Sequence, residues 1–169
     1  MSIIDDLVRK VAALEKTVER LSTIEQYPGT KFAVSPEGGI MVRLTNKTGA
    51  ASVKGNVVTN SATTANAVTL AVDGEPDAFG VFYASGIADG SEAWVVVSGI
   101  ADVYFIGSTT LGHLARTFIS GEAGYVTGQA ISEAIPAAPF ATDKHFCEIG
   151  HLLESRVGSG LAKCVLHFN

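Results

Sequence analysis

The sequence predicts a mainly β protein: an antiparallel β-sandwich or barrel preceded by an N-terminal α-helix that forms a short parallel coiled coil. Two observations support this fold class. Many short strand-like segments follow one another beyond residue 30, and the chain has 18 glycines to supply turns between them. The one long helical pattern lies at the N-terminus, so no helix is available to cross over between parallel strands. We divide the chain into a coiled-coil helix over 2–21, a linker over 22–30 and a β-rich domain over 31–169.

An apolar heptad pattern supports the helix. If Ile4 is placed at position a of a heptad, every a and d position up to residue 21 is apolar. These residues, which we call the seam, are Ile4, Leu7, Val11, Leu14, Val18 and Leu21. Ser2 and Asp5 form an S-x-x-D capping signature at its start. Because a lone helix of about 20 residues is only marginally stable in water, we expect this seam to be an oligomer interface. The alternative is an amphipathic helix that packs on its own domain.

The seam composition bears on the number of chains. Valine at a and leucine at d favour a parallel dimer, whereas Ile3 and Val8 widen the apolar stripe and suit a third strand. Lys10 at g and Glu15 at the following e have the spacing of a salt bridge between parallel chains. We expect a homotrimer, with a dimer as the alternative.

The remaining elements follow in order. Tyr27-Pro28-Gly29 ends the helical pattern, because a proline disfavours helix before it and glycine permits a reversal. Turn residues at Ser35–Gly39 and Arg156–Gly160 predict a first and a last hairpin. Ile131–Phe140, which contains two prolines, predicts an extended surface crossing, and 143–148 fits either one helical turn or a strand. The predicted strands are 31–34, 40–44, 52–58, 67–72, 79–85, 93–106, 116–119, 125–126, 149–154 and 161–168.

Composition argues against several classes of partner. Apolar residues make up 47% of the chain and charged residues 17%, a balance typical of a subunit with buried interfaces. The net charge of −5 and the absence of a basic run argue against nucleic acid and anionic membranes as partners. No signal peptide or membrane span is apparent, so we expect Cys147 and Cys164 to be reduced thiols.

Candidate metal ligands gather in the last 25 residues: His145, Cys147, His151, Cys164 and His167. Their spacing does not match the paired ligands of structural zinc sites, and Cys164 and His167 would face opposite sides of one strand. We therefore expect buried thiols and partnered histidines, with no metal and no cofactor.

Catalytic candidates are weak. A nucleophilic triad would have to combine Ser85 or Ser98, Asp89 or Asp102, and His113, but no G-x-S-x-G elbow or phosphate-binding loop occurs. These residue types are also those that hairpin turns use, so we predict no catalytic residues and no enzyme. The aromatic residues expected in the core are Trp94, Tyr104, Phe105 and Phe118. Tyr83 and Tyr125 are less clearly buried, which leaves open sugar binding by an exposed aromatic.

Four stretches of the β-rich domain carry a resemblance to a known family: Gly80–Tyr83, Gly90–Gly99, His145–Ser155 and Ala162–Phe168. They resemble the small capsid decoration proteins of tailed bacteriophages, also called head-stabilising or cement proteins, and the similarity covers roughly residues 50–169. The resemblance implies a β-rich, non-enzymatic and often trimeric protein. It also implies a virion location, on the outside of the assembled shell, with the major capsid protein as partner and assembly in the host cytoplasm. The heptad segment is a departure, since not every such protein has one.

Two other functions stay open. A receptor- or carbohydrate-binding fibre or tail module on a coiled-coil stem would share the predicted architecture. An enzyme with a zinc or cysteine centre near 145–167 is the third alternative.

Overall fold

The computed structural model describes residues 10–12, 31–74, 77–118, 123–135 and 147–167. Its strands are β1 (Phe32–Val34), β2 (Gly39–Asn46), β3 (Val57–Asn60), β4 (Ala67–Leu70), β5 (Gly80–Phe82), β6 (Glu92–Phe105), β7 (Leu114–Arg116), β8 (Ile131–Glu133), β9 (Glu148–Leu152) and β10 (Gly160–Leu166). The mainly β prediction is confirmed. Residues 10–12 are helical, and Val11 is 46% exposed. The other seam residues, and the predicted linker, lie outside the described ranges.

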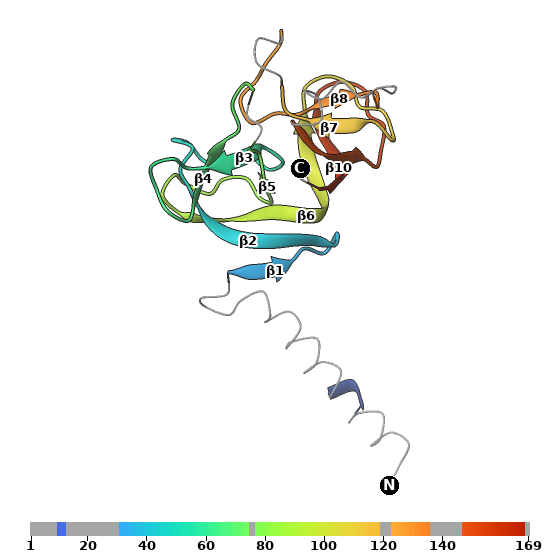
Figure 1. The fold of residues 1–169 in the computed structure, drawn as a ribbon. Helices are drawn as coiled ribbons and strands as arrows, with labels where there is room; N and C mark the ends of the chain where they lie inside the picture. The colour runs from blue at the N-terminus through green and yellow to red at the C-terminus, as the bar shows by residue number, and fades with distance from the viewer. Residues whose placement is uncertain (1–9, 13–30, 75–76, 119–122, 136–146, 168–169) are drawn as a thin grey trace.

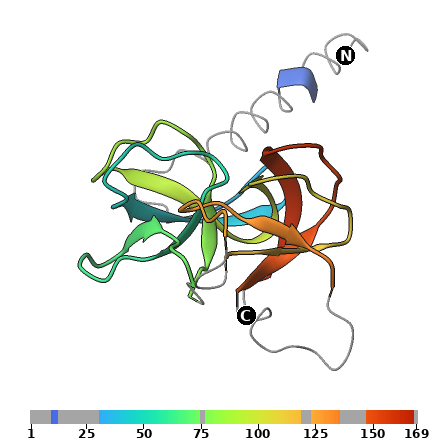
Figure 2. The same ribbon diagram turned by 90° about the horizontal axis from the view of Figure 1, so that it is seen from above.

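The strands form one sheet with the order β1-β2-β4-β3-β5-β6-β10-β9-β7-β8, and β2 also pairs with β6. That extra pairing closes β2, β4, β3, β5 and β6 into a ring. The other strands of the sheet follow β6 in the order β10-β9-β7-β8. An isolated bridge joins Phe105, at the end of β6, to Ala130, just before β8, so these five strands curl into a second lobe. Figure 1 and Figure 2 show the two lobes side by side with the long β6 between them. Among the described strands the pairings are antiparallel except that of β2 with β4.

Glycine allows β6 to serve both lobes. Its first half pairs with β2 and its second half with β10, and Gly99 takes part in both pairings. Gly99 has φ +80°, and a Cβ there would lie 2.5 Å from the Gly38 carbonyl oxygen. On the paired strand, a Cβ on Gly39 would lie 2.6 Å from the Ile100 carbonyl oxygen. The two backbones therefore approach more closely than any side chain permits.

Both faces of the first ring are buried. Neighbouring residues in β3 (Val57, Val58), and likewise in β5 and β6, belong to two different hydrophobic clusters. Because successive side chains of a strand point to opposite faces, the sheet packs on both sides. This double burial explains the unbroken apolar run of Val95–Val97 and the high apolar content of the chain.

The predicted hairpins are confirmed, but several other boundaries are wrong. β1 pairs with β2 over Ser35–Gly39, and β9 with β10 over the turn that precedes Gly160. Residues 52–56 are not strand, because Ser52 uses its hydroxyl and amide to hold a loop against Ala84 and Ile87.

Three further differences concern the second lobe. The strand predicted at 116–119 is β7, two residues earlier, and residues 125–126 lie in a glycine-flanked turn in which the Gln129 amide donates to the Val126 carbonyl. The surface crossing predicted from Ile131 instead starts as β8, since Ser132 pairs with Ala115. At the ambiguous 143–148, Glu148 opens β9 and the residues before Cys147 lie outside the described ranges.

Candidate functional site

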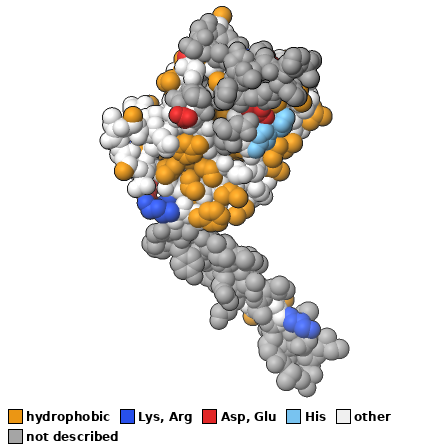
Figure 3. Space-filling model, viewed as in Figure 1, with side chains coloured by type: hydrophobic (Ala, Val, Ile, Leu, Met, Phe, Trp, Pro, Cys, Tyr) orange, Lys and Arg blue, Asp and Glu red, His pale blue; other side chains and the backbone are white. Residues whose placement is uncertain are grey.

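An apolar face covers the outer strand pair, with three exposed side chains and Val42 half-buried against the core. Phe32 and Val34 are each 56% exposed and Ile40 is 38% exposed. Phe32 pairs with Val42 and Val34 with Ile40, so these four side chains share one side of the β1–β2 ribbon. We call them the ribbon face. Figure 3 shows hydrophobic side chains gathered over this lower part of the body.

Charged residues border the ribbon face. Glu92 lies 3.5 Å from the Lys31 Nζ and 3.6 Å from the Arg43 Nε. The Arg43 guanidinium lies over the Trp94 ring at 5.3 Å. An apolar centre with a polar, half-exposed border is the usual composition of a protein–protein contact surface.

A second charged group lies on the second half of β6. The Asp102 carboxylate contacts Lys54 Nζ at 2.8 Å and Lys163 Nζ at 3.0 Å. Burial raises the pKa of Asp102, but the hydrogen bonds and charges of the two lysines outweigh it and leave the pKa below its ordinary value. Lys163 belongs to β10 and Lys54 to the loop before β3, so the two ion pairs of Asp102 connect β6 to both.

The serine, aspartate and histidine candidates for a triad are held in separate places. The Ser85 hydroxyl accepts a hydrogen bond from the Lys54 amide at 2.8 Å, and Asp89 accepts one from the Gly49 amide at 2.9 Å. Ser98 pairs with Ile40 within the sheet. His113 lies 3.3 Å from the Ser132 hydroxyl. These partners belong to separate loops and strands of the body.

The core aromatic residues are only partly as predicted. Phe105 and Phe118 are buried, whereas Trp94 and Tyr104 are half-buried. Tyr125 packs edge-on against Phe118 with ring centroids 5.6 Å apart, and Tyr83 packs against the core beneath the Lys54 ammonium. Within the described residues, Phe32 is the one aromatic side chain in the exposed class.

The metal-ligand candidates separate into two groups. Cys147 and Cys164 are buried free thiols, and burial raises the pKa of Cys164 to about 12. His151 and His167 lie together on the surface, with ring centroids 4.8 Å apart, and His145 lies outside the described ranges. The expectation that Cys164 and His167 face opposite sides is confirmed, since Cys164 is buried and His167 is exposed.

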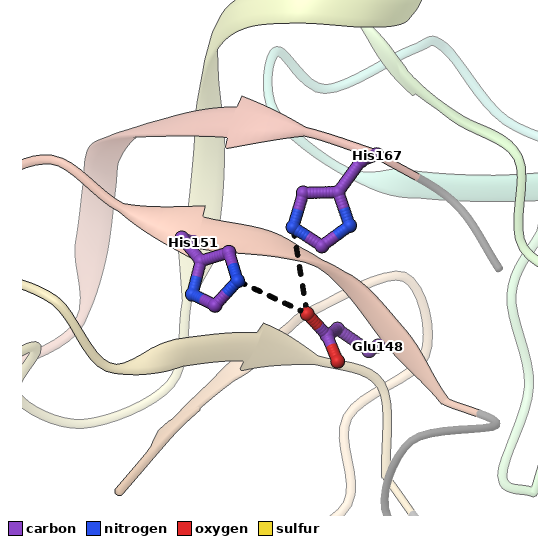
Figure 4. Close-up of side chains that lie close together, drawn as sticks. All are labelled: Glu148, His151 and His167. Atoms are coloured by element: carbon purple, nitrogen blue, oxygen red, sulfur yellow. Dashed lines mark ion pairs between the residues drawn. The ribbon is translucent and has the colours of Figure 1, made fainter. Parts of the chain in front are cut away.

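Glu148 joins the two histidines, a grouping that the sequence analysis missed. Its Oε1 lies 3.4 Å from the Nε2 of His151 and 3.4 Å from the Nε2 of His167. Figure 4 shows both rings turned toward this carboxylate. His151 is opposite Val165, and the His167 amide donates to the Ile149 carbonyl, so the histidines are diagonal neighbours on the β9–β10 pair.

A β-bulge explains why the strand pattern did not reveal Glu148. Residues three apart on a regular strand point to opposite faces. Here Gly150 pairs with Ala115 and Glu148 with Arg116, so Ile149 is an extra residue and Glu148 returns to the face of His151. Gly150 has φ +155°, and a Cβ there would lie 2.1 Å from the Val165 carbonyl oxygen. Only glycine fits this bulge.

No family model and no curated protein matches this chain. In the described ranges we also find no helix with the length and apolar character that crossing a membrane would need.

Proposed function

We propose that this chain is a non-enzymatic structural protein that binds the outer surface of a phage capsid as a symmetric oligomer and stabilises the shell. The ribbon face carries the proposal. It is an apolar, charge-bordered surface that follows the heptad segment along the chain, after the predicted linker over 22–30. The resemblance to decoration proteins supports the location on the virion and the major capsid protein as partner.

In this proposal the N-terminal helix forms a short parallel coiled coil, with a homotrimer favoured. Ile4, Leu7, Val11, Leu14, Val18 and Leu21 form its seam. A parallel arrangement brings the C-terminal ends of the helices together, and with them the edge strand β1 of each copy. The ribbon faces then lie around one axis, and several weak contacts to a symmetric shell act together by avidity.

The seam is tested by the mass of the protein in solution. Replacing Leu7→Asp and Leu14→Asp together should convert the oligomer to monomers in light scattering, because two buried charges per helix oppose association. Ala12→Asp with Ala13→Asp is the matched control, since these b and c positions face away from the seam. An unchanged mass in the Leu7/Leu14 variant contradicts the proposed seam.

Shell binding is tested by cosedimentation with purified shells of the phage that encodes the chain. Wild-type protein should sediment with the shells, and Phe32→Ser with Val34→Ser should reduce binding by more than about tenfold, because the centre of the contact is lost. Val157→Ser is the control, as Val157 is 93% exposed and lies outside the ribbon face. Wild-type protein that stays in the supernatant would refute the capsid role.

The receptor- or carbohydrate-binding module is the second candidate, and the exposure of Phe32 is the observation in its favour. An aromatic ring stacked on a sugar contributes to binding only where its face is open. Binding on a glycan array that is abolished by Phe32→Ser, together with absence of the chain from purified particles, would establish that candidate in place of the first.

A further inference from the structure

We propose that Glu148, His151 and His167 form a binding site for a divalent transition-metal ion, with Zn²⁺ as the preferred ion. The proposal does not depend on the capsid role. It rests on three donor atoms, two from β9 and one from the residue that follows β10, which meet at one point of the surface of the second lobe.

The two distances from Glu148 to the histidines fit a tetrahedral ion. Zinc binds imidazole nitrogen and carboxylate oxygen at about 2.0–2.2 Å, so two ligand atoms at tetrahedral corners are about 3.3–3.5 Å apart. Glu148 Oε1 lies 3.4 Å from each Nε2, and all three donor atoms lie within 4.8 Å of one another. The separations are longer than a normal N–H···O hydrogen bond, which is typically 2.7–3.2 Å. Both histidine–carboxylate separations therefore match those of ligands around a shared ion, and the third donor pair lies within 4.8 Å.

The donor set also selects the class of ion. Two imidazoles and one carboxylate suit zinc and other late first-row ions, whereas magnesium and calcium take oxygen ligands. Three protein ligands on zinc leave a fourth position for water. The buried thiol of Cys164 lies on the opposite side of β10 from His167, and neither Cys164 nor Cys147 belongs to the cluster.

The backbone holds the donors in place before any ion binds. The bulge at Ile149 places Glu148 on the same face as His151. At position 150, glycine is the one residue type that fits. The Glu148 side chain is 4% exposed, whereas those of His151 and His167 are 38% and 42% exposed. A fixed carboxylate beneath two accessible imidazoles gives the ion both a defined position and an entry path.

The test uses the full chain purified without a histidine tag and stripped with a chelator. Titration with Co²⁺ should give the visible absorption of a tetrahedral ion at one equivalent per chain, and Zn²⁺ should displace it. His151→Ala, His167→Ala and their double variant should each weaken Zn²⁺ binding in calorimetry by more than about tenfold. His113→Ala is the control, because this partly exposed histidine lies outside the cluster and should leave binding unchanged.

A second measurement covers the variants that fold poorly. The Glu148→Gln variant alters a buried side chain, so the fold of this variant is checked by circular dichroism. The double histidine variant changes only surface positions. Zn²⁺ should raise the Tm of wild-type protein and leave that of the double histidine variant unchanged, since only the native site binds the ion. Failure of wild-type protein to bind Zn²⁺ or Co²⁺, or undiminished binding by the double variant, would overturn the site.

Discussion

At the scale of single residues, polar side chains fix loops that the strands leave irregular. Asn46 is fully buried: its Nδ2 donates to the carbonyls of Ala50 and Ile87, both at 2.8 Å, and its Oδ1 accepts from Thr48. Asn46 begins an N-x-T sequon, but an amide with both donors and its acceptor engaged inside the fold is a structural residue.

Protonation of Asp102 should lower the free energy of unfolding at acidic pH. Its pKa is lower in the folded chain than in the unfolded chain, so its contribution is fully present above about pH 4 and is lost as the pH falls through the folded pKa. Asp102→Asn should lower the free energy of unfolding at pH 7 by about 1 kcal/mol, since both lysines are partly solvated. Urea unfolding at pH 7 and pH 3 should show this difference shrinking with acid, and a constant difference would contradict the assignment.

Cys164 should be an inert thiol. Burial raises its pKa to about 12, so at pH 8 it is protonated as well as inaccessible, and the thiolate is the reactive form. Ellman's reagent should therefore label wild-type protein and Cys147→Ser alike only after guanidinium is added, because Cys147 is buried too. Rapid labelling of native Cys147→Ser protein would show that Cys164 is accessible.

At the scale of elements, turn chemistry was the most informative signal. Ser35–Gly39 and the turn before Gly160 both predicted hairpins, and both form because their glycines adopt positive φ angles that the reversals need. The long apolar segment 93–106 also predicted β6 almost to its ends. These features are local, and local sequence is enough to specify them.

Features that depend on distant contacts were not predictable. Ser52–Asn56 has strand-like composition, but the Ala84 carbonyl and the amide and carbonyl of Ile87 hold this part of the chain as a loop from more than 30 residues away. The Glu148 bulge is set by the register with β7, which no pattern within β9 reveals. The strand order, including the parallel β2–β4 pair, likewise follows from the closure of the ring.

The crossing of Gly39 and Gly99 gives a test at this scale. Gly99→Ala should destabilise the protein by at least about 2 kcal/mol, because it adds a Cβ 2.5 Å from the Gly38 carbonyl oxygen to the cost of a positive φ. Gly107→Ala is the matched control, with the same φ of +80° and nothing within 4 Å of the added Cβ. It should cost only about 1 kcal/mol. Equal losses in thermal or urea unfolding would contradict the close crossing.

At the scale of the whole molecule, two surfaces are proposed to bind partners: the ribbon face binds the capsid, and the heptad segment binds other copies of the chain. If the chains associate through the seam, the Tm of wild-type protein should rise with concentration by mass action. The Tm of the Leu7→Asp/Leu14→Asp variant should be independent of concentration across the same range. Calorimetry from micromolar to near-millimolar protein measures both, and a concentration-independent wild-type Tm would count against the oligomer.

The sharing of β6 has a consequence for how the body comes apart. A single stretch of backbone, Glu92–Phe105, is a wall of both lobes, with β2 and β5 along one half and β10 along the other. Unfolding of either lobe removes hydrogen-bond partners of β6, the strand that the other lobe also contains. The described body should thus denature as one cooperative unit, so that a load applied to one lobe is resisted by both.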